Sequence, residues 1–157
     1  EIWTTLTDDP ARWYTSGFTY SGHPVSCAAA LKNIEIIERE DLLGNTVRIG
    51  AVFQEGLRTL NALPLVGDVR GEAMIACVEN VADKATGAKL PEALDVGRRV
   101  AEAAQARGLF VRPIGHLNVM SPALVLTAGQ AEFIIETLSA AIVQVTDDLV
   151  RDGIRIG

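Results

Sequence analysis

A loop of glycines and hydroxyl groups leads directly into an apolar-periodic segment near the N-terminus. Gly17, Thr19, Ser21 and Gly22 stand before Pro24, and proline is favoured in the first turn of a helix because its missing N–H would be unpaired there anyway. A helix N-terminus offers free N–H groups and a partial positive charge, so neighbouring hydroxyls and small residues are typical of a phosphate site. Thr19 and Ser21 could also cap the helix, and the spacing by itself favours capping.

Arg112 lies in the middle of a short apolar segment, LFVRPIG. A charge on such a strand needs water, an acidic partner or a ligand carboxylate, and a planar guanidinium can bind a carboxylate through two hydrogen bonds. An exposed or ion-paired arginine explains the spacing equally well. Arg70, in GDVRGE, raises the same question, although an arginine in a glycine-flanked turn is more often solvated or bonded to the backbone.

Other reactive groups give weaker signals. His23 precedes Pro24, which predicts a structural role at the helix entrance through a hydrogen bond of its ring. His116 is the only other histidine, so no metal-ligand spacing is present and no metal is predicted. Each lysine lies among polar or charged neighbours, which argues against a desolvated nucleophile at Lys32, Lys84 or Lys89.

The composition argues against several classes of function. The 157 residues carry a formal charge of −6 and no run of Lys or Arg, so the basic footprint of nucleic-acid binding is missing. No apolar run approaches the length that spans a bilayer. Cys27 and Cys77 stand far apart in apolar runs, which predicts buried thiols in a reducing compartment and a cytoplasmic protein.

Helical periodicity predicts three main helical segments, at 24–62, 91–107 and 128–151. The first segment fits two helices or one helix bent near Gly44, and Gly108 is the predicted stop of the second. The third sets an apolar stripe on one side of a long helix. That stripe consists of Ile134, Leu138, Ile142, Val145 and Leu149.

Three short strands are predicted between these helices. One is the second half of LVGDVRGEAMIACVENV, and the others are LFVRPIG and HLNVMSPAL, which meet at a tight turn near Gly115. A tight turn joins antiparallel strands. The predicted fold class is therefore α+β, with a small antiparallel sheet covered by helices.

Six motifs follow one another along the chain: TSGFTYSGHP from Thr15 to Pro24, AAALKNIEIIERE, VGDVRG, ENVADKAT, GLFVRPIG and NVMSPALVLT. In their order and spacing they resemble one family, the class III pyridoxal-phosphate-dependent aminotransferases. The TYSGHP entrance is most similar to that of the ω-transaminases that use pyruvate as amino acceptor. The resemblance covers nearly the whole chain and implies the C-terminal part of a fold-type-I transferase.

The resemblance also implies site residues. Thr19 would hydrogen-bond the phosphate of the pyridoxal 5'-phosphate (PLP) held by the opposite subunit of a homodimer, with Phe18 beside it lining that subunit's site. Arg112 would bind the carboxylate of an amino or keto acid and move aside for amines that have none. The family's Schiff-base lysine, its pyridinium-binding aspartate and its stacking aromatic residue would all precede Glu1, so no catalytic residue is expected in this chain.

The first residues, EIWTTL, have a helical pattern, and Met74 and Met120 are the only methionines. We therefore expect a C-terminal portion of a longer protein. By resemblance, residues 1–24 would end the large PLP-binding domain and carry the phosphate loop, residues 25–62 would be connecting helices, and residues 63–157 would form the small domain.

Two departures from the family pattern leave the substrate preference open. Ala73 stands where the family often has glycine, and Ala123 stands where a second proline is common. The parent could be an aminotransferase, or it could catalyse another class III reaction such as aminomutation or decarboxylation-linked transamination. A non-catalytic remnant that serves only in dimerisation is the alternative from a different class.

Overall fold

The computed structural model describes residues 2–13 and 17–157. The chain divides into two compact units, residues 1–40 and residues 41–157. The division follows helix α2 (Pro24–Arg39) and precedes helix α3 (Leu42–Arg58), so the first predicted helical segment is two helices. Asp41 separates them in a left-handed conformation with φ 48°, and its carboxylate accepts a hydrogen bond from the Gly44 N–H at 3.3 Å.

In its described residues, 2–13 and 17–40, the first unit has two α-helices and one short 3-10 helix. Helix α1 (Ile2–Thr7) is followed by the 3-10 helix Pro10–Arg12, in which Asp9 accepts a hydrogen bond from the Ala11 N–H. Helix α2 buries no residue in this chain, although Leu31 and Ile34 repeat at helical spacing. Cys27 of α2 is exposed, so the prediction of a buried thiol there is wrong. An apolar run on a helix is buried only where another element packs on it.

The second unit is built on a four-stranded antiparallel sheet in the order β1-β2-β4-β3. The strands are β1 (Val66–Glu72), β2 (Ile75–Asn80), β3 (Arg112–Ile114) and β4 (Leu117–Met120). The antiparallel pairing of LFVRPIG with HLNVM is confirmed, with the turn at Gly115 (φ +56°). Strand β1 was missed because its two glycines and three charged residues have low strand propensity, and pairing with β2 outweighs that preference.

The helices of the second unit come in the predicted order, and the helix predicted at 91–107 is shorter than expected. Helix α4 is Val96–Gln105, preceded by the 3-10 helix Glu92–Leu94, because Asp95 adopts a left-handed conformation (φ 41°) between them. Gly108 has φ +88°, which confirms the predicted stop. Helix α5 is Ala128–Arg151, where Thr127 and Gln130 form a reciprocal capping box. A 3-10 helix, Thr59–Ala62, continues from α3.

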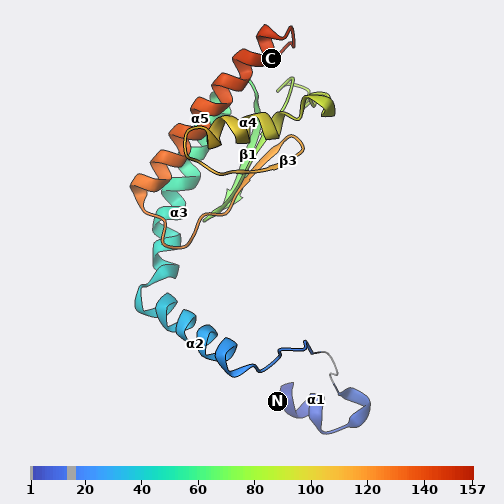
Figure 1. Ribbon diagram of the computed structural model, residues 1–157, viewed down its shortest axis with the longest axis vertical. Helices are drawn as coiled ribbons and strands as arrows, with labels where there is room; N and C mark the ends of the chain where they lie inside the picture. The colour runs from blue at the N-terminus through green and yellow to red at the C-terminus, as the bar shows by residue number, and fades with distance from the viewer. Residues whose placement is uncertain (1, 14–16) are drawn as a thin grey trace. The chain divides into compact units, whose positions relative to one another are not determined.

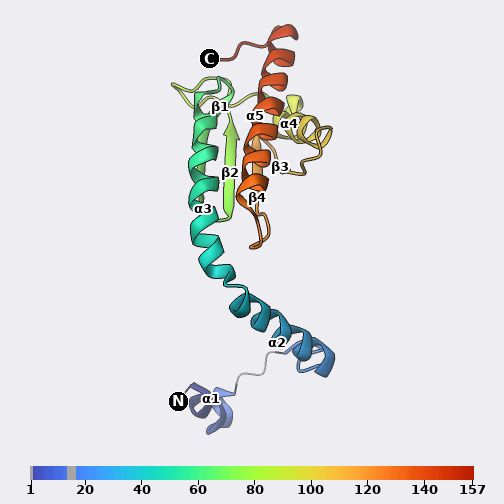
Figure 2. The same cartoon turned by 90° about the vertical axis from the view of Figure 1, so that its left-hand side faces the viewer.

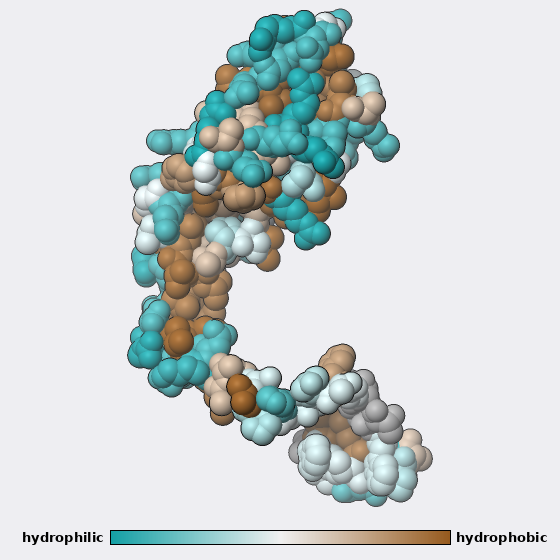
Figure 3. Space-filling view, viewed as in Figure 1, coloured by the Kyte–Doolittle hydropathy of each residue, from teal (hydrophilic) through white to brown (hydrophobic). Residues whose placement is uncertain are grey.

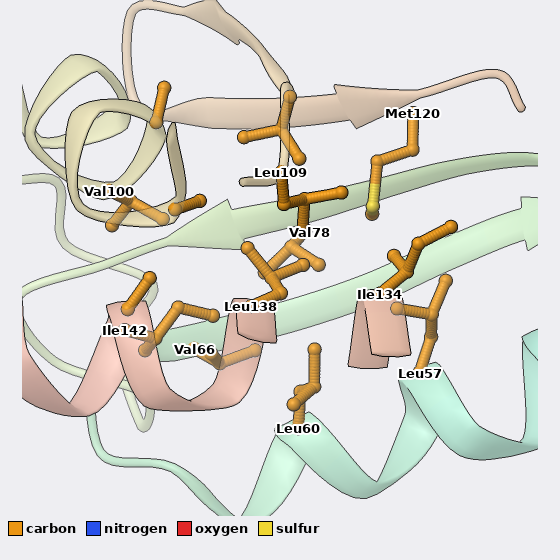
Figure 4. Close-up of a cluster of buried hydrophobic side chains, with 14 of the residues drawn as sticks. Leu57, Leu60, Val66, Val78, Val100, Leu109, Met120, Ile134, Leu138 and Ile142 are labelled. Carbon is orange, nitrogen blue, oxygen red and sulfur yellow. The ribbon is translucent and has the colours of Figure 1, made fainter. Parts of the chain in front are cut away.

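One face of the sheet packs on helices and the other does not. Figures 1 and 2 show α3, α5 and α4 gathered against the sheet. Along β2, Ala76 and Val78 are buried while Ile75 is exposed and Cys77 is partly so, because successive strand residues point to opposite faces. The helix-covered face carries the core (Figure 4), and all five residues of the predicted α5 stripe belong to it. We call the other side the open face.

The first turns of α3 carry apolar side chains outside this core. Leu43 and Val47 are exposed, and Figure 3 shows apolar surface over this part of the helix. None of the helices in the described ranges is long and apolar enough to cross a membrane.

Candidate functional site

A row of four residues crosses the open face of the sheet from edge to edge. Arg70 pairs with Cys77, Cys77 with Val119, and Val119 with Arg112 in the strand register. The two arginines therefore lie at opposite edges, about 14 Å apart between α-carbons at a strand spacing of about 4.8 Å. The row allows the surroundings of the two candidate carboxylate-binding residues to be compared directly.

The guanidinium of Arg70 is already occupied by acidic partners. Its Nη1 atom lies 2.9 Å from the Asp68 carboxylate and 2.5 Å from that of Glu79. Glu79 is largely buried and also pairs with Lys89. Arg70 lies within β1 rather than in a turn, and these ion pairs neutralise it, so it is a poor receptor for a ligand carboxylate.

Arg112 has no such partner. Within residues 2–13 and 17–157 its guanidinium makes no hydrogen bond or ion pair, and the residue is exposed. It lies at the border of a cavity of about 430 Å³ whose surface is mainly apolar. The lining residues come from the β3 and β4 strands, their flanks and α5: Leu109, Phe110, Val111, Arg112, Val119, Met120, Ser121, Pro122 and Ile134.

An unpaired guanidinium beside an apolar hollow can bind an organic acid. A guanidinium of this kind can bind a carboxylate through two hydrogen bonds, and apolar walls can receive the rest of such a molecule. Among the residues on the sheet's open face, Phe110 and Ile114 follow the same period of two as Arg112 and add exposed apolar surface beside it. The arrangement supports carboxylate binding more strongly than the sequence did, because no acidic side chain competes.

Buried asparagines hold the hairpin that carries Arg112. The Asn118 Nδ2 atom donates to the Gly97 carbonyl at 2.8 Å, and the Asn80 Nδ2 atom donates to the His116 carbonyl at 2.8 Å. The Gly97 N–H donates in turn to the Gly115 carbonyl at 3.1 Å. The β3–β4 turn is thus tied to β2 and to the start of α4, which fixes the position of the strand bearing Arg112.

Cys77 and His116 are two further titratable groups whose surroundings the structure shows. Burial raises the pKa of the Cys77 thiol and outweighs the opposing effect of Arg70, so the thiol stays protonated and weakly nucleophilic. Burial, followed by the positive charges of Lys89 and Arg70, lowers the pKa of His116, so its imidazole is neutral at pH 7. Cys77 is partly buried rather than fully buried as predicted.

The three lysines are all engaged. Lys32 pairs with Glu35 at 2.6 Å and Lys89 pairs with Glu79. The Lys84 Nζ atom donates to the carbonyls of Asn61 and Leu63 at the end of the α3 segment. Each of the three amines thus has a partner in the described structure.

The loop before α2 is shaped by two consecutive turns. The Ser21 N–H donates to the Phe18 carbonyl at 2.9 Å, and the His23 N–H donates to the Tyr20 carbonyl at 3.1 Å. The Ser21 hydroxyl accepts a hydrogen bond from the Phe18 N–H at 2.8 Å. Ser21 therefore closes the loop on itself and does not cap the helix.

Thr19 does not cap the helix either. The N-cap position of α2 is His23, and no side chain caps it. In the part of the chain that the structure describes, the exposed Thr19 hydroxyl has no partner. The His23 ring makes an edge contact with Tyr20, at 5.6 Å between centroids, and the predicted ring hydrogen bond is not found among the described residues. The uncapped helix N-terminus and the free hydroxyl fit a phosphate chemically. Thr15 and Ser16 of the predicted motif lie outside the described residues.

Comparison with known proteins shows the family to which the chain belongs. The model of the family "Aminotransferase class-III" matches residues 4–142. The chain belongs to the class III aminotransferase family. An uncharacterized aminotransferase of Sinorhizobium fredii is 40% identical over 143 residues, which are 89% of this chain and 31% of that protein. A diaminobutyrate–2-oxoglutarate transaminase of Halomonas elongata is 39% identical over 140 residues, 87% of this chain and 30% of that protein.

Solved structures agree with the fold. The (S)-enantioselective ω-transaminase of Thermomicrobium roseum superposes with a TM-score of 0.85 at 38% identity, covering 92% of this chain and 32% of that one. The fold class predicted from the sequence is thereby confirmed: this class III aminotransferase chain has the α+β fold of the corresponding part of solved transaminases. It spans about a third of the length of the relatives it matches.

The sequence did not identify the lining of the cavity or the buried asparagines. Phe110, Val119 and Ser121 were read only as parts of strands, and Asn80 and Asn118 were not singled out. The usable signal was the period of two, which places alternate residues around Arg112 on one face. The asparagines interrupt apolar strands, where a polar side chain needs a buried partner.

Proposed function

We propose that this chain is the C-terminal part of a PLP-dependent aminotransferase that moves an amino group from an amine or amino acid to a keto acid. The observation that carries the proposal is Arg112, whose guanidinium has no acidic partner among the described residues and lies at the border of an apolar cavity. In this role Arg112 binds the carboxylate of the amino or keto acid. The family membership of the chain supports the reaction class.

The acceptor that this surface fits best is a small monocarboxylic keto acid such as pyruvate. Arg70, the other arginine in the described strands, is neutralised by Asp68 and Glu79. One carboxylate can therefore be bound by a free guanidinium here, and the apolar walls suit a methyl group better than a second charge. A donor amine that lacks a carboxylate would require the flexible Arg112 side chain to move away from the cavity.

Thr19 is proposed to bind the PLP phosphate of the opposite subunit in a homodimer. Its hydroxyl is exposed and unpartnered, and the neighbouring helix N-terminus adds a favourable electrostatic field. Phe18 is 87% exposed in this chain and would contact the same site. When bound, PLP supplies the electron-accepting ring and the carbonyl carbon through which the amino group is transferred. Thr19 would orient that cofactor, and Arg112 would orient the substrate.

The same proposal assigns each part of the chain to a domain of the full-length protein. Residues 1–24 would end the large domain with the phosphate loop, residues 25–62 would connect, and residues 63–157 would form the small domain that carries Arg112. The lysine that binds PLP covalently would belong to the rest of the protein, which we expect to be cytoplasmic.

The experiment is an absorbance spectrum of the full-length protein with PLP, before and after an amine donor is added. We expect a band near the visible edge that bleaches with the amine and returns with pyruvate. Absence of the band after incubation with PLP would instead support a non-catalytic dimerisation role. Return of the band only with another keto acid would overturn the pyruvate assignment while leaving transamination intact.

The role of Arg112 is tested by the two half-reactions separately. Arg112→Ala should weaken the binding of pyruvate by ten-fold or more, because a pair of charge-assisted hydrogen bonds is lost. The half-reaction with an amine that has no carboxylate should proceed as before. Arg70→Ala is the matched control, and it should leave the pyruvate half-reaction nearly unchanged. Equal losses for pyruvate and amine in Arg112→Ala would refute the assigned role.

A further inference from the structure

A hydroxyl group shares the cavity of Arg112. Ser121 follows β4 (Leu117–Met120) directly and lines the same hollow as Arg112. It stands two residues after Val119, the strand partner of Arg112, and so continues the same side of the extended chain. Ser121 is exposed, and its hydroxyl has no partner within the described ranges of the chain.

We infer that Ser121 is a second hydrogen-bonding residue of the carboxylate site and a specificity-determining residue for keto and amino acids. This inference rests on the proposed function. A diagonal neighbour across a strand pair lies about 7–8 Å away, within reach of a long arginine side chain and its ligand. A carboxylate bound bidentately by Arg112 still has free lone pairs, and one of them can accept the Ser121 hydroxyl.

The surroundings make this hydroxyl effective. Phe110, Val119, Met120 and Ile134 line the cavity with apolar groups. A keto acid bound against these groups would displace water from the exposed site, and a hydrogen bond to its carboxylate is stronger once water is displaced. Arg70 and Glu79 neutralise each other on the other half of the sheet. Ser121 is therefore the neutral donor best placed to share an anion with Arg112 among the residues that line this cavity.

The hydroxyl also distinguishes between substrates. An amine donor without a carboxylate gains nothing from Ser121, whereas a keto acid gains one charge-assisted hydrogen bond. The residue is exposed at the end of a strand, so replacing it leaves the core unchanged. The effect of substitution is expected in binding of the acid alone.

The test uses the full-length enzyme with Ser121→Ala, Ser121→Thr and Arg112→Ala, in single-turnover half-reactions followed by the cofactor absorbance. Ser121→Ala should raise the apparent dissociation constant of pyruvate about ten-fold and change that of an amine without a carboxylate less than two-fold. Ser121→Thr, which keeps the hydroxyl, should restore most of the pyruvate affinity. Unchanged pyruvate affinity in Ser121→Ala, or an equal loss for the amine, would overturn the inference.

The outcomes separate this inference from the proposed function. If Arg112→Ala weakens pyruvate binding and Ser121→Ala does not, Ser121 does not bind the carboxylate, and the proposed function stands. If the unmodified full-length protein does not transaminate, the proposed function fails, and calorimetric titration of that protein with pyruvate then tests Ser121 separately. Several-fold weaker pyruvate binding in Ser121→Ala would support the inference, and identical titrations of the variant and the unmodified protein would reject the shared site.

Discussion

The Asn80 Nδ2 atom donates a hydrogen bond of 2.8 Å to the Asn118 Oδ1 atom, and both side chains are completely buried. Asn118 uses its own amide to hold the Gly97 carbonyl at 2.8 Å. The pair joins β2, β4 and the start of α4 beneath the strand that carries Arg112. A buried polar link of this kind is costly to break because each group left behind loses its partner.

Asn118→Ala should therefore lower the free energy of unfolding by about 2–3 kcal/mol, since the Gly97 carbonyl loses its side-chain donor and the buried Asn80 amide keeps only the His116 carbonyl. Urea denaturation followed by circular dichroism measures the change. Asn61→Ala is the control, because Asn61 is exposed and its side chain makes no hydrogen bond in the described residues. Equal effects of the two substitutions would contradict the role of the buried pair.

Gln54 of α3 ties the helix to the β1–β2 turn. Its Nε2 atom donates to the carbonyls of Ala73 and Ile75, both at 3.0 Å, from a buried position. Gln54→Ala should cost about 1–3 kcal/mol of stability because two carbonyls lose a donor. Gln144→Ala, on the exposed side of α5, should change stability by less than about 0.5 kcal/mol. Thermal denaturation of both variants measures the two effects. Similar melting temperatures for the two variants would show that the Gln54 hydrogen bonds to the β1–β2 turn do not stabilise the protein.

Ala73 occupies the turn between β1 and β2 with φ +49°. A left-handed conformation costs a residue with a β-carbon roughly 1–2 kcal/mol, and glycine avoids this cost at an entropic penalty of about 0.5–1 kcal/mol. Ala73→Gly should thus raise the unfolding free energy by roughly 0.5 kcal/mol. In contrast, Ala140→Gly, within α5, should lower it by about 1 kcal/mol. Destabilisation by both substitutions would show that strain at Ala73 is not significant.

If Thr19 binds the PLP phosphate as proposed, Thr19→Ala should weaken retention of PLP by the full-length protein. Loss of one hydrogen bond to a charged phosphate corresponds to roughly 1.5–3 kcal/mol, or about ten-fold to a hundred-fold in affinity. Thr19→Ser keeps the hydroxyl and should retain most of the affinity. Equilibrium dialysis against PLP measures both variants, and wild-type retention by Thr19→Ala would remove Thr19 from the phosphate site.

His116 should titrate below the ordinary histidine value of about 6.5. Burial and the charges of Lys89 and Arg70 lower its pKa, and the Glu79 carboxylate 3.6 Å away is already paired with both cations. As the pH falls, the unfolded state binds a proton at His116 before the folded state does, because its pKa is higher. The contribution of His116 to stability is therefore complete above pH 6.5 and is lost as the pH falls through the pKa of the folded state.

An NMR titration of the His116 ring measures this pKa directly. Lys89→Gln should raise the midpoint, because it removes one positive charge and frees Glu79 to favour the imidazolium. A midpoint that stays fixed in Lys89→Gln, or that lies above the value of a histidine model peptide, would be inconsistent with this account.

The sequence determined the elements with strong local signals. The 3.6-residue period and the Gly108 stop predicted α4 and α5, and the tight turn at Gly115 predicted the antiparallel β3–β4 pair. Motifs spaced over most of the chain identified the family. These features depend on residues close together in the chain, so local preference and spacing are sufficient to read them.

Only the tertiary structure decided which polar groups are already satisfied. Sequence spacing could not rank Arg70 against Arg112, because the Glu79 carboxylate that neutralises Arg70 comes from the neighbouring strand. It also could not show that Thr19 and Ser21 leave α2 uncapped, or that β1 forms despite its glycines. A hydrogen bond or ion pair between distant residues depends on register and burial, and these exist only once the strands and helices have packed.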